Sequence, residues 1–194
     1  MLGENETCDD GNIQDSDGCS AQCRQEFIVF ASDILYTADL TPTDHMDLSG
    51  LDRADANCQD LAANASLPGQ YSAWLSDGQE GPSKRFGLTG FTGNFVLADG
   101  TLLAEGWPDL IDAELITGIG RDQYGEVLNP GRVWTHTSTD GTPYNDNPCS
   151  HWTGTGILQN ARTGAMSSKS AGWTSADDYT CENSARIYCF QIAE

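Results

Sequence analysis

The alternation of apolar and polar positions predicts where the ordered part of the chain begins. From Phe27 the stretch "FIVFASDILY" is strongly apolar, and in a strand Phe27, Val29 and Ala31 would share one face. The stretch before it is polar and cysteine-rich, and it has too few large apolar side chains to fold around a core of its own. We therefore expect two parts, a small segment over 1–26 and a globular domain over 27–194.

A second pattern follows in "MDLSGLDRADANCQDLAANASLPG", where apolar residues recur at spacings of three and four. This spacing predicts an amphipathic helix with a cysteine on its buried face. Ser49 or Asp47 is available as the N-cap, and Pro68 with Gly69 is expected to stop the helix. The predicted buried face consists of Leu51, Ala54, Cys58, Leu61, Ala62 and Ala65.

The remaining pattern predicts short elements joined by polar loops. Residues 71–77 are expected to form a short strand, and residues 94–107 a hairpin that turns at Asp99 and Gly100. A short helix is expected after it, with Pro108 in its first turn. Beyond this point short strands alternate with long polar loops, so the predicted class is α+β.

Charge narrows the possible partners. Nine basic and twenty-nine acidic side chains give a formal net charge of −20, which would repel nucleic acid and anionic membranes. Such acidity is compatible either with solubility in an extracellular setting or with cation binding. No apolar run reaches the roughly 20 residues of a membrane span, so no membrane insertion is expected. The start "MLGENET" has no signal-peptide features, and we expect a segment cut from a longer precursor.

Seven cysteines indicate an oxidising compartment and therefore a secreted or cell-surface protein. There is no C-x-x-C motif and no cysteine–histidine cluster with zinc spacing. The four cysteines of the globular part allow three pairings, between which the sequence does not decide. They are Cys58, Cys149, Cys181 and Cys189, and the other three are Cys8, Cys19 and Cys23.

Several motifs that are separated along the chain together resemble a known family. In order they are "GLDRADANCQDLAA", "LPGQYSAWLSD", "VWTHTSTDG", "NPCSHW" and a final pair of cysteines with seven residues between them. Over about 34–192 this succession resembles the endostatin-like branch of the C-type-lectin-like fold, and in particular bacterial surface-protein domains of the leptospiral endostatin-like family. The resemblance implies an α+β C-type-lectin-like (endostatin-like) fold with long polar loops. It also implies nested disulfides, Cys58 with Cys189 and Cys149 with Cys181.

The first segment has a resemblance of its own. "GENETCDDGNIQDSDGCSAQC" is similar to the cysteine-rich repeats of myxobacterial and other bacterial secreted proteins, which usually carry four cysteines. Here the first is missing, so one of Cys8, Cys19 and Cys23 is expected to lack a partner. The acids between them would suit calcium, although tight turns between disulfides explain the same composition. The candidate calcium ligands of this segment are Asp9, Asp10, Asn12, Asp15 and Asp17.

The globular part offers a second candidate cation site. In "SADDYTC" Asp178 stands where calcium-dependent lectins of the resembled fold carry the aspartate of a Trp-Asn-Asp triplet, and Asp177 replaces the asparagine. The Glu-Pro-Asn type of triplet that those lectins also use is absent. Together with Asp146, and with Glu182 nearby, the two aspartates form an acidic loop cluster that is a candidate for Ca²⁺.

Candidate ligand-binding residues come from the same loops. Trp74 and Trp134 lie in strand-like motifs and are expected in the core. Trp107, Trp152 and Trp173 lie beside loops, where they either pack into the core or the loops or present a ring that stacks on a sugar or anchors a protein. His45, His136 and His151 lie in three different segments and indicate no site. The predicted ligand-binding set is Tyr144, Asn145, Asn147, Trp152, Trp173 and Glu182.

These observations favour binding over catalysis. The sequence has no G-x-S-x-G or H-E-x-x-H motif and no cysteine left over in the globular part for a nucleophile, so an enzyme is not expected. We expect an extracellular binding or adhesion module that recognises a protein or glycan through its long loops, with calcium as a candidate cofactor. The alternative is a structural subunit or spacer of a surface filament or multidomain adhesin, which would self-associate.

Overall fold

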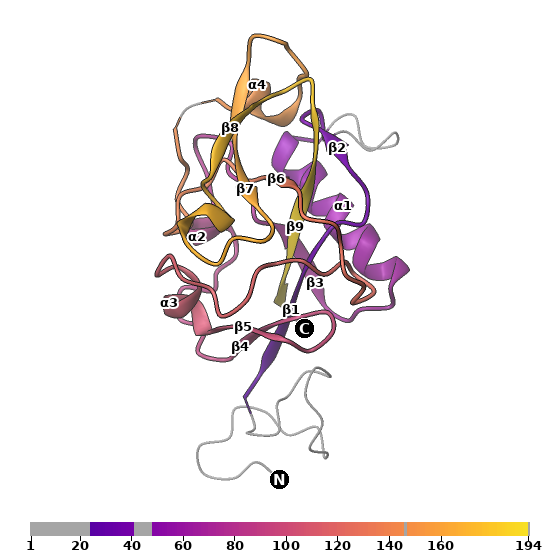
Figure 1. The fold of residues 1–194 in the computed structure, drawn as a ribbon, viewed down its shortest axis with the longest axis vertical. Coiled ribbons are helices and arrows are strands. Elements are labelled where there is room, and N and C mark those ends of the chain that lie inside the picture. Colours follow the sequence, from indigo (N-terminus) through magenta and orange to yellow (C-terminus); the bar gives the residue numbers. More distant parts are fainter. Residues whose placement is uncertain (1–23, 41–47, 146, 194) are drawn as a thin grey trace.

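A single mixed sheet organises the molecule (Figure 1). The computed structural model describes residues 24–40, 48–145 and 147–193. Within these ranges nine strands belong to the sheet. They are β1 (Glu26–Ala31), β2 (Tyr36–Thr37), β3 (Gln70–Ala73), β4 (Asn94–Leu97), β5 (Leu102–Glu105), β6 (Arg132–Trp134), β7 (Asn160–Ala165), β8 (Asp177–Thr180) and β9 (Ser184–Ala193).

The last strand, β9, is the centre of the sheet. The strands follow the order β5-β4-β1-β9-β6-β7-β8, and β2 and β3 also pair with β9. The β1–β4 and β6–β9 pairs are parallel, and the other pairs are antiparallel. Because β9 contacts four other strands, the final residues of the chain join segments that are far apart in the sequence.

Both faces of the sheet are covered. Along β1, Phe27, Val29 and Ala31 lie in one buried cluster and Ile28 and Phe30 lie in the other. The prediction that the first three share a face is therefore confirmed. We call the cluster that contains the apolar residues of the long helix the helix-side core, and the other the loop-side core. A strand buried on both faces reads as a continuous apolar run, as "FIVFA" does.

The long predicted helix is confirmed as α1 (Gly50–Asn64). Ser49 is its N-cap, and the Ser49 hydroxyl accepts a hydrogen bond from the backbone N–H of Asp52 at 3.3 Å. The predicted face is buried up to Ala62, whereas Ala65 lies past the last helical turn as the C-cap. The helix ends one turn before Pro68 because Ser66 adopts a positive φ of 59°, and the backbone N–H groups of Ser66 and Leu67 then cap the carbonyls of Ala63 and Ala62.

The expected α+β fold of the C-type-lectin-like (endostatin-like) type is wrong, because the molecule is mostly β. Four α-helices occur in the described ranges, and only α1 is longer than five residues. The others are α2 (Pro82–Arg85), α3 (Gly106–Leu110) and α4 (Cys149–Trp152), and η1 (Ala171–Trp173) is a single 3₁₀ turn. The region predicted as short strands and long polar loops contributes β6, β7 and β8, whose strand pairing does not depend on a long apolar pattern.

The shorter predictions have mixed outcomes. The hairpin is confirmed: β4 and β5 flank a turn in which Gly100 has a φ of +85°. The helix around Pro108 is shorter than expected, since α3 ends at Leu110. Just beyond it, the Asp112 carboxylate accepts the N–H of Glu114 at 2.8 Å, a local turn that competes with helix.

β1 begins at Glu26, one residue before the predicted start of the globular part. Residues 1–23 lie outside the described residues, so the boundary between the two predicted parts stays a prediction. Among the helices that the structure describes, none has both the length and the apolar character needed to cross a membrane.

Candidate functional site

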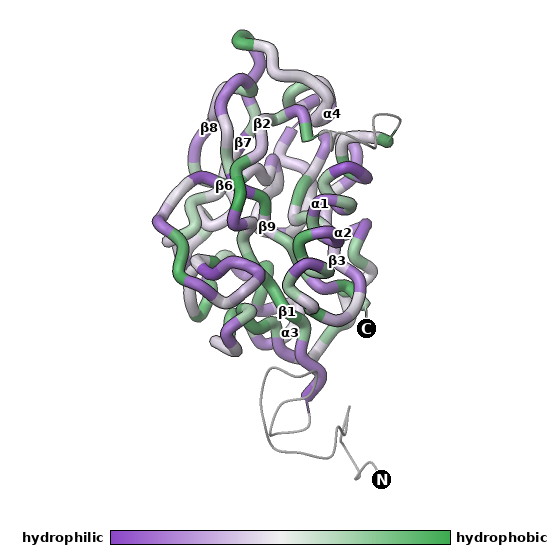
Figure 2. The backbone as a smooth tube through the Cα atoms, turned by 90° about the vertical axis from the view of Figure 1, so that its right-hand side faces the viewer, coloured by the Kyte–Doolittle hydropathy of each residue, from purple (hydrophilic) through white to green (hydrophobic). Residues whose placement is uncertain are grey.

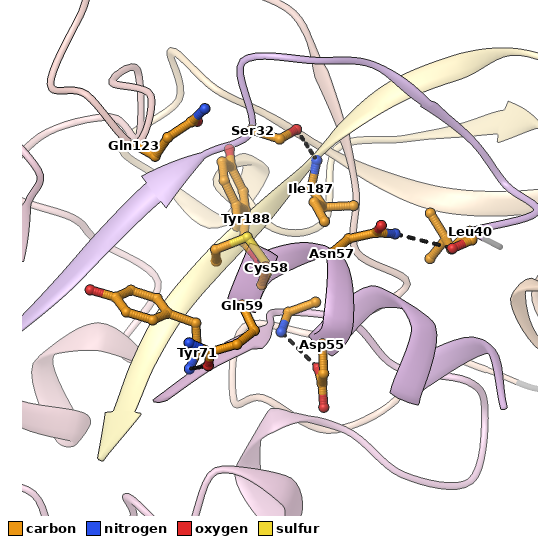
Figure 3. Close-up of a disulfide and its surroundings, with 12 residues drawn as sticks. Ser32, Leu40, Asp55, Asn57, Cys58, Gln59, Tyr71, Gln123, Ile187 and Tyr188 are labelled. Carbon is orange, nitrogen blue, oxygen red and sulfur yellow. Dashed lines mark hydrogen bonds between the residues drawn. A yellow bond between two sulfur atoms is a disulfide. The ribbon is translucent and has the colours of Figure 1, made fainter. Parts of the chain in front are cut away.

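Two disulfides link the segments around the loops that were predicted to bind a ligand. Cys58 of α1 is bonded to Cys189 of β9, and Cys149 of α4 is bonded to Cys181, which follows β8. The nested pairing is therefore confirmed. Figure 3 shows the first of these bonds between the helix and the central strand. The remaining three cysteines, Cys8, Cys19 and Cys23, lie outside the described residues.

The second disulfide holds a turn of unusual backbone. All four residues of α4 have positive φ, from 46° at Cys149 to 64° at Trp152, and Asn147 just before them has 47°. For L-residues such left-handed conformations are unfavourable by about 1–2 kcal/mol each, so they persist only where the surroundings fix them. Strain of this kind clusters at functional sites, which makes α4 the first candidate position in the fold.

Side-chain hydrogen bonds keep this turn in place. The indole N–H of Trp152 donates to the carbonyl of Ser76 at 2.7 Å, and Nδ1 of His151 lies 2.8 Å from the carbonyl of Asp77. The Asn147 side chain accepts the backbone N–H of His151 at 3.1 Å. Asn147 is thus a structural partner of the turn, and α4 is attached to the chain that follows β3.

After α4 the chain forms a strongly exposed apolar feature, which includes the most exposed large hydrophobic residue of the described part of the chain. In the loop between α4 and β7, Ile157 is 66% exposed and Leu158 is 93% exposed. Figure 2 shows this loop as a hydrophobic tip at one end of the molecule, far from the start of β1. We call these two residues the apolar tip. Neither residue is in the predicted ligand-binding set, although two adjacent aliphatic residues in the polar stretch "TGTGILQN" indicate an exposed apolar site.

Near α4 and its loop, the buried residue His136 contacts two of the predicted ligand residues, Tyr144 and Asn145. His136 is 2% exposed, and its Nδ1 accepts the backbone N–H of Arg162 at 3.1 Å. Nε2 therefore carries the proton and donates to the carbonyl of Asn145 at 3.2 Å. Burial lowers the pKa of His136, against smaller raising contributions that begin with the hydrogen bond to Asn145. A neutral imidazole with this tautomer fits both bonds.

Tyr144 is the one aromatic residue of the predicted ligand-binding set that the fold leaves accessible, and Asn145, Asn147 and Glu182 are exposed as well. Its side chain is 42% exposed, and the guanidinium of Arg162 lies 5.0 Å from the centre of its ring. The Arg162 guanidinium also donates to Ser175 at 3.1 Å and to Asp178 at 3.4 Å. Tyr144 is therefore held by a cation–π contact with one arginine, which in turn is fixed by Asp178 of β8 and by Ser175, two residues before that strand.

The acidic loop residues are paired with arginines. Asp177 contacts Arg132 at 3.3 Å and Asp178 contacts Arg162 at 3.4 Å, while Glu182 is exposed. Within the ranges that the structure describes, no group of three or more histidine, cysteine, aspartate or glutamate side chains could hold a metal ion. Asp146 is outside those ranges. The structure thus does not bring together Asp177, Asp178 and Glu182 as calcium ligands.

The candidate calcium ligands of the first segment also lie outside the described residues, so calcium binding there stays a prediction. They are Asp9, Asp10, Asn12, Asp15 and Asp17.

Trp152 and Trp173 pack into the core, so their place in the predicted ligand-binding set is wrong. Both are fully buried, as are Trp74 and Trp134, for which burial was predicted. Trp173 packs against Trp74 with ring centres 4.8 Å apart, so it belongs to the loop-side core. Polar neighbours in the sequence did not indicate exposure because these rings are covered by segments that are distant along the chain.

Comparison of the chain with protein-family models finds no match, and comparison with curated proteins finds no significant match. The endostatin-like resemblance and the likeness of residues 1–26 to cysteine-rich repeats therefore stay predictions. Function has to be argued from the surface of the molecule itself.

Proposed function

We propose that this chain is an extracellular binding module that recognises a protein partner through the apolar tip. The carrying observation is the exposure of Ile157 and Leu158, 66% and 93%, next to each other in one loop. Single exposed apolar residues are ordinary on a protein surface, but an adjacent pair at the end of a molecule favours contact with a partner. The tip is small, so the interface would be completed by neighbouring loop residues, of which Tyr144 is one candidate.

Rigidity at the base of the loop supports this proposal. α4 precedes the tip, and it is fixed by the Cys149–Cys181 disulfide and by the indole of Trp152. On the other side, Gln159 exchanges hydrogen bonds with Ser150 at 3.1–3.2 Å, which closes the loop. A loop whose ends are fixed loses less conformational entropy on binding, and this raises affinity.

A protein is favoured over a glycan. Sugar recognition commonly uses an exposed aromatic ring as a stacking platform, and Trp152 and Trp173 are buried. Tyr144 is exposed, but one face of its ring is occupied by Arg162. The two aliphatic side chains of the tip instead suit an apolar pocket on a protein partner.

The extracellular setting rests on the two disulfides, which persist in oxidising compartments. The net charge of −20 fits the same setting because it keeps the chain soluble. The alternative role as a structural subunit receives less support. The edge strand β8 presents the exposed carboxylates of Asp177 and Asp178, and charge on an edge opposes pairing with a second sheet.

A binding panel tests the proposal. Immobilised extracellular matrix proteins and a glycan array would be probed with the wild-type chain and with a double variant, Ile157→Ser with Leu158→Ser. Val127→Ser is a matched control because Val127 is 72% exposed on a different loop. Burial of a leucine side chain contributes about 1.5–3 kcal/mol, so the double variant should bind a matrix protein at least about tenfold more weakly.

The outcomes separate the two roles. Binding of a matrix protein that the control keeps and the double variant loses supports the proposal. Binding to glycans alone, or affinity unchanged in the double variant, contradicts it. Sedimentation velocity on the same samples addresses the alternative, since self-association that the double variant abolishes would make the tip an assembly contact instead.

A further inference from the structure

Four of the eight exposed large hydrophobic residues in the described part of the chain lie on two neighbouring segments. Ile34 and Leu35 are in the turn between β1 and β2, and Tyr124 and Val127 are in the loop that leads into β6. They are 49–72% exposed. We call these four residues the side patch.

Hydrogen bonding and packing place the turn beside the loop. The backbone N–H of Asp33 donates to the side-chain oxygen of Gln123 at 3.3 Å. Leu35 lines a hollow of about 400 Å³ together with Asn129 and Pro130. Because the turn meets the loop on both sides of Tyr124 and Val127, the side patch is one surface and not four isolated side chains.

Both segments are fixed by local hydrogen bonds. The Asp122 carboxylate accepts the backbone N–H groups of Tyr124 and Glu126, each at 2.9 Å. In the turn, the Ser32 hydroxyl donates to the carbonyl of Ile34 at 2.8 Å. A surface that is held in place before contact loses less conformational entropy when a partner covers it.

Charge distinguishes this surface from the rest of the chain. The segments 33–35 and 121–132, with Arg186 from the lining of the same hollow, hold three of the nine basic and three of the twenty-nine acidic residues. The remaining positions hold six basic and twenty-six acidic residues, so the whole net charge of −20 belongs to them. The side patch therefore lies in a region that is close to neutral.

Two carboxylates from other segments change this only slightly. Asp99 contacts Arg121 at 2.7 Å and Asp177 contacts Arg132 at 3.3 Å, which brings the local charge to −2 when both are counted. Two copies of so acidic a chain repel each other over most of their surface. The repulsion is weakest where two nearly neutral regions meet, and there the burial of apolar side chains can exceed it.

We infer that two copies of this chain associate through the side patch. A partner of strong positive charge is drawn to the acidic remainder of the surface, and one of strong negative charge is repelled, so the patch fits a neutral apolar partner. The same patch on a second copy is such a partner, and the contact is isologous about a two-fold axis. It closes on itself and gives a dimer, not a filament. This inference goes beyond the proposed function, since it uses none of the residues of the apolar tip.

The size of the side patch sets the expected strength. Contacts at the low end of the range of interface sizes are weak and transient, so we expect a dissociation constant on the order of 100 μM. Well below this concentration the chain is a monomer, and Val127→Ser therefore remains a valid control for binding through the apolar tip.

Sedimentation velocity on the whole chain tests the inference. Samples from about 5 to about 500 μM would be compared at about 50 and about 500 mM NaCl. The sedimentation coefficient should rise with concentration. The rise should be larger at the higher salt concentration, because salt screens the repulsion between the two acidic copies and leaves the apolar contact intact.

Variants assign the contact to the side patch. Leu35→Ser with Val127→Ser should weaken the dimer at least about tenfold, since apolar side chains on both copies are lost. The tip variant, Ile157→Ser with Leu158→Ser, is the matched control because it makes the same kind of change at two exposed aliphatic residues. It should keep the dimer, so failure of this inference and failure of the proposed function are distinguishable.

A second variant guards against loss of folding. Val127→Asp places one added negative charge on each copy at the two-fold contact and should also abolish the dimer, and far-UV circular dichroism shows whether each variant is folded. Four results overturn the inference. They are a monomer under all conditions, full association in the folded side-patch variants, association that the tip variant abolishes, and association that weakens as salt rises.

Discussion

Cys58 in the middle of α1 is bonded to Cys189 in β9 across 131 positions of sequence, and polar neighbours of Cys58 on the helix bond to adjacent segments (Figure 3). Asn57 donates to the carbonyl of Leu40 at 3.0 Å. Gln59 accepts the backbone N–H of Tyr71 at 3.0 Å. The helix is therefore joined to the sheet by a covalent bond and by hydrogen bonds that surround it.

Removal of the two disulfides should have unequal effects. Without a disulfide the unfolded chain gains conformational entropy, and this lowers the free energy of unfolding. The expected loss is about 5 kcal/mol for the paired change Cys58→Ala and Cys189→Ala. The corresponding cost is about 3.7 kcal/mol for Cys149→Ala and Cys181→Ala, because this loop spans only 32 positions. Urea unfolding of both double variants measures the difference. A larger loss from the shorter loop would show that local packing around α4 outweighs chain entropy.

The elements that the sequence could predict are those encoded locally. The alternation along β1, the spacing and cap of α1, and the turn at Gly100 each depend on neighbouring residues. The disulfide pairing was predicted only through a resemblance. The pairing that the resemblance implied is confirmed, whereas the fold class that it implied is wrong. A pairing concerns four positions, and a fold class concerns the whole chain.

What could not be predicted depends on distant segments. The central place of β9 follows from its pairing with β1, β2, β3 and β6, and no local pattern contains that information. Burial of Trp152 is set by Ser76, whose carbonyl accepts its indole N–H from 76 positions away. The left-handed conformation of the α4 residues could not be predicted either, because the stretch "CSHW" contains no glycine that would indicate positive φ.

The close approach of α1 to α4 gives a second prediction. A Cβ on Gly50 would lie 2.0 Å from the backbone carbonyl oxygen of His151. Alanine is the better helix former by about 1 kcal/mol, but overpacking against a fixed backbone costs about 1–3 kcal/mol, so Gly50→Ala should destabilise the fold. Gly90→Ala is the control, because nothing lies within 4 Å of its added Cβ. Thermal melts compare the two, and an unchanged Gly50→Ala midpoint would mean that α4 moves freely.

An ion pair between α1 and α2 gives a third prediction. Asp55 accepts two hydrogen bonds from Arg85 at 2.6 Å and one from the backbone N–H of Ala73 at 2.9 Å. The Arg85 side chain is only 10% exposed, so Asp55→Ala leaves a largely buried charge without its carboxylate and should cost about 3 kcal/mol. Asp55→Asn keeps an acceptor for Ala73 and should lose less.

The control for this pair is Asp60→Ala, an exposed aspartate on the same helix. Chemical denaturation should rank the stabilities as wild type and Asp60→Ala, then Asp55→Asn, then Asp55→Ala. Similar losses for the two Asp55 variants would mean that only the charge matters.

His136 makes the fourth prediction, which concerns pH. Because burial lowers its pKa in the folded state, the unfolded chain binds the proton more readily below the unfolded pKa of about 6.5. The stability contributed by the neutral ring is therefore fully present above this pH and is lost as the pH falls toward the folded pKa. His136→Asn tolerates the positive φ of 47° and removes the titration.

Between pH 7 and pH 5 the wild type should lose stability faster than His136→Asn, by at most about 1.4 kcal/mol per pH unit. The variant starts from a lower stability because it gives up the bonds to Arg162 and Asn145, so the comparison uses slopes and not absolute values. Urea unfolding at four pH values gives both slopes. Parallel lines would assign the acid sensitivity of the fold to its carboxylates, and an NMR titration of the His136 ring that moves above pH 6.5 would contradict the buried neutral state.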